Sequence, residues 1–450
     1  MSISLYKTSW LVWRRFPRVT AVLFCLVLTQ NGVAQIERGG EDFSAEIFFS
    51  PKSVDNALGV ADGSETPVRE RQTEYGASVR SVWTSELTEL DVDYQYSETE
   101  FDKDSQQDGT FRVGGSSFIL GNDTSFYQLT AEHSIRRVLR QPNAVVIDLG
   151  NSEERQIRSV MPMLRARFNG ANSVAVAYSF TQVDFEDSLD NSSTRDDIQL
   201  QFHRNISPLS DFQFSVGSRA VDYDTSDTGD YDLKFASVEL TVEQRIFSYS
   251  MALGYSEITP ELGEKHGSNT FEFVINSELA GNRFEVFASK VISDTSTGNA
   301  NDSFFAEEVS FDGGQEERDQ VVRTAAGVSW EYEFLCGRCT LSAALGSEKV
   351  EHVNFSVNDT KETFFDLTFG YQFSRQLMGR FSYRQSDSEF PDPSSLLVDS
   401  GSEVGRIELV YTMNRQFEIS FEHEQDTRDT GEDESATVDT TGLIFTYRFD

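Results

Sequence analysis

Apolar and polar residues alternate along much of the chain after residue 34, and this period of two predicts β-strands with one apolar face. In the segment 90–96, for example, Leu, Val and Tyr side chains alternate with acidic and amide side chains. The same alternation recurs in residues 198–203, 247–255, 365–373, 407–413, 417–421 and 443–449. No segment predicts a convincing helix. No apolar run after residue 34 approaches the roughly eighteen residues that a transmembrane helix needs.

Short and long connections alternate through most of the second half of the chain. The short ones are residues 169–172, 207–211, 280–282, 336–339, 374–376 and 414–416. The longer polar ones are residues 186–195, 225–231, 260–268, 293–319, 386–403 and 425–436. Outer-membrane β-barrels have short periplasmic turns and long external loops, so this alternation favours a barrel. Counting backward from the C-terminus requires strands near residues 110–119 and 43–49, which gives about twenty strands, with eighteen as the next choice.

These patterns together predict an all-β fold: a single closed antiparallel transmembrane β-barrel of about 18–20 strands, with short periplasmic turns and long acidic external loops. Proline placement supports this prediction because proline deletes a hydrogen bond of the ladder. Every proline after residue 34 except Pro162, Pro51 included, falls in a predicted connection, and we expect a bulge at Pro162. The alternative is a secreted β-sandwich or solenoid. A sandwich of this length should divide into several domains, and the sequence shows no linker.

The N-terminal segment has the layout of a secretory signal peptide. Residues 1–18 are basic, residues 19–28 are apolar, and small residues precede Ala34. Ten apolar residues are too few to span a bilayer core of about 30 Å. We therefore expect a cleaved signal peptide at residues 1–34 and a barrel at residues 35–450, located in the outer membrane of a Gram-negative bacterium. The Arg14-Arg15 pair leaves twin-arginine export open as an alternative.

The composition supports a barrel and excludes several other classes. The 450 residues include 74 acidic and 38 basic ones, a formal net charge of −36. Binding of nucleic acid through a basic surface is therefore not expected. Apolar residues make up only 38%, which is low for a globular chain of this size. Aromatic residues nevertheless reach 12%, so the chain is not a simple disordered acidic polymer.

The last predicted strand carries a pattern typical of outer-membrane proteins. Gly442 is followed by aromatic residues at alternating positions, Phe445, Tyr447 and Phe449. This pattern resembles the signal by which the barrel assembly machinery recognises its substrates. Asp450 departs from the usual pattern because it follows the final aromatic residue.

Over most of its length after residue 34, the chain also resembles an uncharacterised family of porin-like outer-membrane β-barrels. The resemblance rests on the first strand at residues 43–49, the Asp55-Asn56 pair and the barrel-like repeat. Members of that family are often associated with exopolysaccharide and exosortase (PEP-CTERM) systems. The resemblance implies an outer-membrane location and exopolysaccharide as a partner, and it says less about activity.

Cys336 and Cys339 flank a turn between two predicted strands, residues 322–334 and 341–347. The first and fourth Cα atoms of a turn lie within about 7 Å, which suits a disulfide. We therefore predict a structural turn disulfide, with free thiols as the alternative. Thioredoxin-like chemistry is not expected, because such motifs open a helix.

No pattern predicts an enzyme, a cofactor or a metal site. The histidines are spread over separate segments, and no local sequence assembles a catalytic group around one of them. The acidic segments at residues 222–232 and 426–439 lack EF-hand spacing. An outer-membrane barrel hydrolase is therefore a less favoured alternative.

Because the outward positions of the predicted strands are apolar, most strand charges should face the lumen. The predicted lumen acids are Asp91, Asp93, Glu239, Glu243, Glu272, Glu285, Glu408, Glu418 and Glu422. Inward basic residues such as Arg80, Arg323 and Arg380 are fewer. An acidic lumen attracts cations. We therefore predict a cation-selective, porin-like channel or a component of exopolysaccharide export.

The alternative function is a plugged structural or interaction barrel that presents acidic loops. Residues 293–319 form the longest connection in the second half of the chain and are the candidate for an infolded loop. The expected partners are outer-membrane lipid, lipopolysaccharide, the barrel assembly machinery, and either exopolysaccharide or cations.

Overall fold

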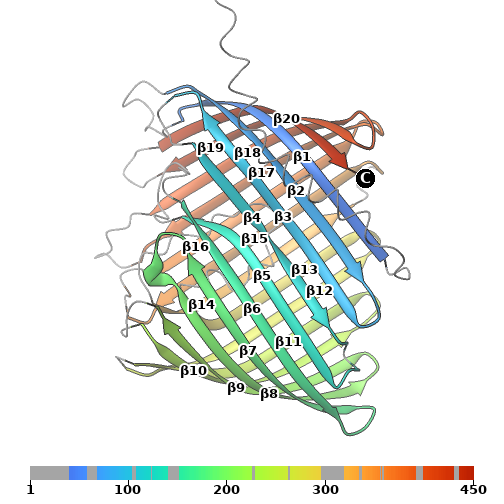
Figure 1. Cartoon of the computed structure of the whole chain (residues 1–450), viewed down its shortest axis with the longest axis vertical. Coiled ribbons are helices and arrows are strands. Elements are labelled where there is room, and N and C mark those ends of the chain that lie inside the picture. Colours follow the sequence, from blue (N-terminus) through green and yellow to red (C-terminus); the bar gives the residue numbers. More distant parts are fainter. Residues whose placement is uncertain are drawn as a thin grey trace, which may run out of the picture. The chain divides into compact units, whose positions relative to one another are not determined.

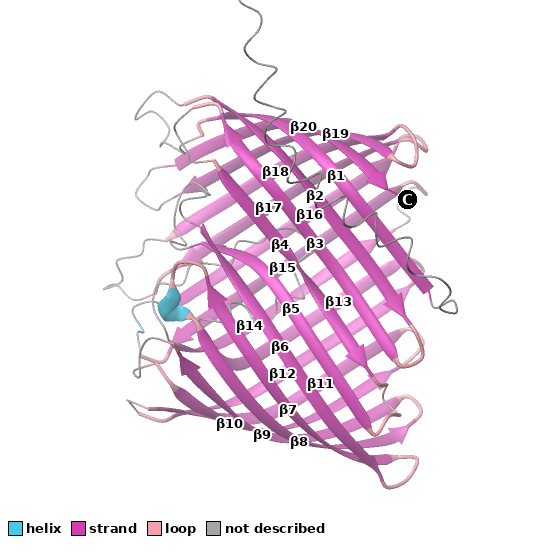
Figure 2. Cartoon of the chain, viewed as in Figure 1, coloured by secondary structure: helices cyan, strands magenta, loops and turns pink. Residues whose placement is uncertain are grey.

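The computed structural model describes residues 40–57, 68–103, 108–122, 124–139, 152–224, 229–261, 264–294, 319–333, 337–354, 356, 359–391, 399–429 and 435–449. Internal contacts divide the chain into two units, Met1–Glu41 and Asp42–Asp450. The described part of the second unit consists almost entirely of strands, with one short 3-10 turn at Leu189–Asn191 (Figure 2). Among the described residues, no helix is long and apolar enough to cross a membrane.

The strands follow one another along the chain. They are β1 (Gly40–Asp55), β2 (Glu70–Thr84), β3 (Thr88–Phe101), β4 (Gly109–Leu120), β5 (Tyr127–Leu139), β6 (Ser152–Arg167), β7 (Asn172–Phe185), β8 (Ser193–Ser207), β9 (Ser210–Tyr223), β10 (Tyr231–Glu243), β11 (Phe247–Pro260), β12 (His266–Leu279), β13 (Asn282–Asp294), β14 (Gln320–Tyr332), β15 (Cys339–His352), β16 (Thr360–Gln372), β17 (Leu377–Glu389), β18 (Ser400–Thr412), β19 (Phe417–Asp429) and β20 (Ser435–Phe449).

The strands form one closed sheet of 20 strands. From β2 to β20, consecutive strands pair in antiparallel registers, and β1 pairs with β2. The ring closes because β1 also pairs antiparallel with β20, from Ala45↔Phe449 to Asp55↔Asp439. Figure 1 shows the first strand, in blue, beside the last, in red. Closure leaves no free edge, so the ladder satisfies its backbone groups internally. The predicted closed antiparallel barrel, with the higher of the two strand counts, is confirmed.

Short turns lie at one end of the barrel and longer connections at the other. In the two-residue turn Ala280–Gly281, the φ angles are positive, at 52° and 79°, as a type I′ hairpin requires. In two other turns an asparagine side chain accepts backbone N–H groups. Asn169 Oδ1 accepts from Ala171 and Asn172, and Asn414 Oδ1 accepts from Gln416 and Phe417, all at 2.8–2.9 Å.

Two of the predicted long connections are shorter than the sequence indicates. Residues 386–403 and 425–436 were expected to be loops, but β17 continues to Glu389 and β19 to Asp429. In these extensions both faces of the strand are polar, so the period-two signal disappears although backbone pairing continues. Asp429, for example, still pairs with Ser435.

Proline placement corrects three further predictions. Pro260 was expected in the connection 260–268, but it is the last residue of β11 and pairs with Tyr231. Pro51 lies inside β1 and not in a connection, and the pairs with β20 are interrupted there, between Phe49↔Phe445 and Lys52↔Gly442. Pro162 lies inside β6 as predicted, but no bulge accompanies it. The register with β7 is the same before and after the gap, at Val160↔Phe180 and Met163↔Ala177. Pro51 and Pro162 therefore each remove rungs of the ladder without adding a residue.

The two faces of the sheet differ in chemistry. Large apolar side chains that remain exposed alternate along the outward face, among them Leu253, Tyr255 and Ile407. The buried apolar clusters lie instead on the inward face. Met163, Ala175 and Ala177 form a cluster nearer the short turn at residues 168–171, and two clusters lie near the end with the longer connections. One consists of Val221, Tyr223, Tyr231, Leu233 and Ile258, and another of Val138, Val183 and Phe185. The barrel therefore has no single central core.

Candidate functional site: the inward face of the barrel

The predicted lumen acids lie on the inward face. The registers place Asp91 opposite Ser117, Glu272 opposite Ala252, and Glu408 opposite Arg380, each across from the apolar outward row. Asp93 and Glu285 follow the same alternation on β3 and β13, as does Glu418 on β19. The structure therefore gathers these carboxylates along one surface, and their effect on permeation stays a prediction.

Some of these carboxylates have a basic partner. Arg380 NH1 lies 3.7 Å from Glu408 Oε2, and Arg448 NH1 lies 3.6 Å from Glu418 Oε2. Arg448 Nε also lies 2.6 Å from Glu46 Oε1, so this guanidinium bridges two acids across β19, β20 and β1. Further inward ion pairs lie on β14–β19, β1 and β2. They are Arg323–Glu348, Arg384–Asp366, Arg406–Glu422, Arg428–Asp426 and Lys52–Glu74.

Other inward carboxylates have no such partner. Within the described part of the chain, no basic side chain forms an ion pair with Asp91, Asp93, Glu272 or Glu285. Glu239, on β10, accepts a hydrogen bond from the Ser250 hydroxyl at 3.0 Å. These carboxylates are available to cations and to hydrogen-bond donors in the lumen.

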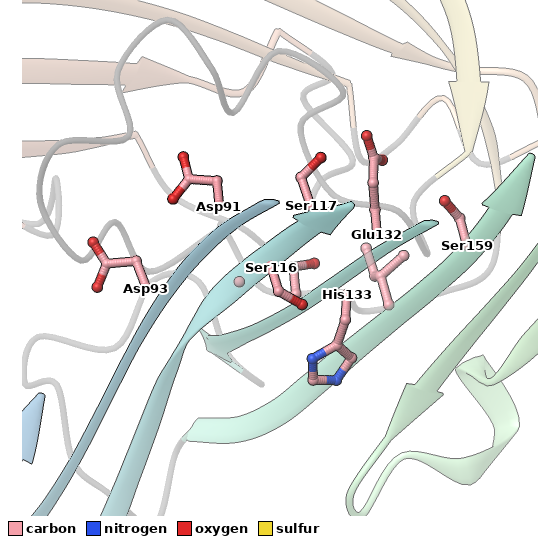
Figure 3. Close-up of a pocket in the computed structure, with 10 residues that line it drawn as sticks. Asp91, Asp93, Ser116, Ser117, Glu132, His133 and Ser159 are labelled. Atoms are coloured by element: carbon pink, nitrogen blue, oxygen red, sulfur yellow. The ribbon is translucent and has the colours of Figure 1, made fainter. Parts of the chain in front are cut away.

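A hollow of about 390 Å³ lies on the inward face where β3, β4, β5 and β6 run side by side. Its lining includes Asp91, Asp93, Ser117, Glu132 and Ser159, whose side chains project to one side of the strands (Figure 3). The wall is recessed here because β4 contributes Gly115 and short serine side chains. The hollow therefore combines carboxylates and hydroxyls, which can accept hydrogen bonds and attract cations.

His133 contributes little to the chemistry of this hollow, because its ring lies on the other side of β5 (Figure 3). Its Nδ1 lies 2.5 Å from the Tyr94 hydroxyl, and its Nε2 lies 2.8 Å from Gln156 Nε2. The imidazole is thus engaged on the outward face, away from Asp91 and Glu132. The hollow does not combine a histidine base with these acids.

A second hollow of about 370 Å³ lies near the short turns of β10–β14. Glu285, Glu278 and Glu331 line it together with Arg283. The Nη1 atom of Arg283 lies 3.5 Å from Glu331 Oε2, whereas Glu285 has no ion-pair partner in the described part of the chain. Glu132 of the first hollow is not predicted from the sequence, because His133 and the arginines that follow it disturb the alternation along β5.

The aromatic residues of the predicted assembly signal lie on the outward face of β20. The rings of Tyr447 and Phe449 meet edge to face, with 4.9 Å between their centroids. The centroid of the Phe445 ring lies 6.4 Å from that of Phe49 of β1. Gly442 is on the inward face opposite Lys52. The aromatic residues therefore border the seam where the barrel closes. Recognition by the assembly machinery stays a prediction.

The predicted cysteine pair is described only in part. Cys339, the first residue of β15, is disulfide-bonded. Cys336 lies outside the described residues, and so do the predicted signal peptide and most of the predicted infolded loop at residues 293–319. The pairing of Cys336 with Cys339 stays a prediction. No group of three or more His, Cys, Asp or Glu side chains suited to a metal ion occurs among the described residues.

Comparisons with known proteins add little. No protein-family model matches the chain, and no curated protein matches it. Solved structures with a similar arrangement include OccAB4 of Acinetobacter baumannii, which is 10% identical, with 91% of this chain and 98% of that chain covered and a TM-score of 0.37. Another is OccK2 of Pseudomonas aeruginosa in complex with glucuronate, which is 12% identical, with coverages of 91% and 98% and a TM-score of 0.38. The outer-membrane protein opdK of Pseudomonas aeruginosa is 12% identical, with coverages of 91% and 99% and a TM-score of 0.36. These similarities are too low to carry an inference about this chain.

Proposed function

We propose that this protein is a porin-like, cation-selective channel in the outer membrane of a Gram-negative bacterium. The observation that carries the proposal is the division of chemistry between the two faces of one closed sheet. Exposed apolar side chains alternate outward, whereas carboxylates and their arginine partners lie inward. A transmembrane barrel has this arrangement, with lipid outside and water inside.

The strand count supports a pore. Barrel diameter grows with the number of strands, and wall side chains fill only barrels of about eight strands. A barrel of 20 strands is too wide to be filled in this way. Its lumen therefore holds either water or additional chain.

One observation favours a second candidate, a plugged barrel with a structural or interaction role. Inward side chains near the longer connections are almost completely buried, with Val183 and Val321 at 0% exposure and Ile258 at 1%. An inward wall that faced only water would leave such side chains exposed. This burial supports a plugged barrel as the second candidate.

Single-channel recording in planar lipid bilayers separates the two candidates. Purified protein in its heat-modifiable, folded form is added to one side of a bilayer in KCl. The channel proposal predicts discrete conductance steps. Absence of steps, with the folded form verified on unboiled gels, would instead support the plugged barrel.

The partners follow from the proposed location. Outer-membrane lipid and lipopolysaccharide would surround the outward face, and the barrel assembly machinery would insert the chain. Export of exopolysaccharide, which the family resemblance implies, has no separate support from the described residues.

A further inference from the structure

The inward carboxylates fall into two groups according to their neighbours. On the paired wall, which we define as the inward face of β14–β20, β1 and β2, most carboxylates lie beside a basic side chain, as Glu408 lies beside Arg380. Other inward carboxylates have no ion-pair partner among the described residues. On β10–β13 these are Glu239, Glu272 and Glu285, and on β3 and β5 they are Asp91, Asp93 and Glu132. We call these six residues the unpaired acids.

The two groups act differently on a passing ion. A carboxylate with a guanidinium within 4 Å forms a dipole, whose field decreases with distance more steeply than the field of a single charge. The field of an unpaired carboxylate extends over about one Debye length, roughly 10 Å at 0.1 M salt, before salt screens it. The unpaired acids therefore dominate the potential in the part of the lumen that they face.

The registers place two of the unpaired acids close together. Glu239 and Glu272 both pair with Ala252, one from each neighbouring strand. Strands lie about 4.8 Å apart, so the two Cα atoms are separated by about 10 Å. Only a methyl group stands between them on this face. Glu285 lies on the next strand, opposite Asn276.

We propose that the unpaired acids set the cation selectivity of the lumen, and that the paired wall is close to neutral for a permeating ion. The permeating class would be small, hydrated cations such as K⁺. This proposal rests on the proposed channel function.

Reversal potentials in a dilute KCl gradient test the proposal. The test variant is Glu239→Gln/Glu272→Gln, which removes two negative charges from the unpaired acids. One control, Asp366→Asn/Arg384→Gln, deletes an ion pair of the paired wall. A second control, Asp387→Asn/Glu403→Gln, removes two exposed acids from the outward face of β17 and β18. The second control matches the test variant in net charge.

We expect the reversal potential of the test variant to move toward zero by more than the measurement error, and those of both controls to remain within error of the wild type. An equal change in the outward control would overturn the proposal, because the net charge of the chain would then determine selectivity. An unchanged test variant would also overturn it. If the double variant does not fold, Glu285→Gln decides by the same measurement, with a smaller expected shift.

Failure of the proposed function gives a different result. In that case the wild-type protein shows no conductance, or prefers anions, before any variant is compared.

Discussion

At the scale of single residues, inward aromatic rings lie over glycines of the neighbouring strand. Phe235 pairs directly with Gly217, and Phe364 pairs with Gly346. A Cβ atom added at Gly346 would lie 2.4 Å from the Phe364 Cζ atom and 3.0 Å from the Ala326 carbonyl oxygen. Glycine is therefore required where the ring packs flat against the backbone, an arrangement that covers a glycine inside a strand.

We predict that Gly346→Ala destabilises the folded barrel by about 1–3 kcal/mol, the usual range for overpacking. The measurement is the temperature at which the folded band converts to the unfolded band on an unboiled gel. Gly405→Ala is the matched control, because an added Cβ there would have no atom within 4 Å. Equal conversion temperatures for the two variants would show that the ring does not require the glycine.

The inward position of these rings is not predicted from the sequence. The alternation correctly assigns Phe365 and Leu367 to one face of β16, but Phe364, on the other face, points toward a lumen expected to be polar. Only the register shows that a glycine lies opposite it. Sequence separation alone does not provide this register.

At the scale of elements, the last strand closes the barrel and carries the predicted assembly signal. We predict that Phe449→Ser lowers the amount of protein in the outer membrane, because it removes the final aromatic residue and its edge contact with Tyr447. Immunoblots of outer-membrane fractions measure the effect.

Phe421→Ser is the control for this variant. Phe421 is an outward, partly exposed aromatic residue on β19, outside the terminal pattern. If both variants reduce the amount of protein in the outer membrane equally, the loss of apolar area explains the reduction without an assembly signal. A normal level of Phe449→Ser would contradict the signal directly.

The turn before β15 gives a second prediction at this scale. We expect a Cys336–Cys339 disulfide whose loss in Cys336→Ser reduces stability by about 2 kcal/mol at most, because the closed loop is short. Peptide mapping under non-reducing conditions checks the pairing. Labelling of both cysteines by a thiol reagent in the unreduced, unfolded protein would contradict it.

Strand existence and order follow from the sequence better than strand ends do. Apolar alternation and the parity of connections predict the closed ring and a count of 18–20 strands, and the structure has 20. The ends of β17 and β19 are not predictable in this way, because both faces are polar beyond the apolar band. The predicted bulge at Pro162 is also wrong. A proline within a strand is compatible either with a bulge or with a simple loss of hydrogen bonds, and only the register distinguishes the two.

For the candidate site too, the sequence predicts part of the arrangement, and the structure is needed for the rest. Period-two alternation places Asp91, Glu272 and Glu408 on one face. The alternation does not show that Arg380 neutralises Glu408 while Glu272 has no basic partner among the described residues. That difference depends on cross-strand neighbours, which come from segments far apart in the sequence.

At the scale of the whole molecule, we propose that a closed barrel with an apolar exterior encloses an acidic, water-filled lumen. The net charge of −36 alone does not establish this, because acidic residues also lie in the connections and on the outward face. What matters is the excess of carboxylates over basic groups along the permeation path.

The most direct test is the reversal potential of the wild-type channel under KCl gradients of one ratio, measured once in dilute and once in concentrated salt. We predict preference for K⁺ in the dilute gradient and a smaller preference in the concentrated one, because salt screens the carboxylates. Preference for Cl⁻ in the dilute gradient would contradict the acidic lumen.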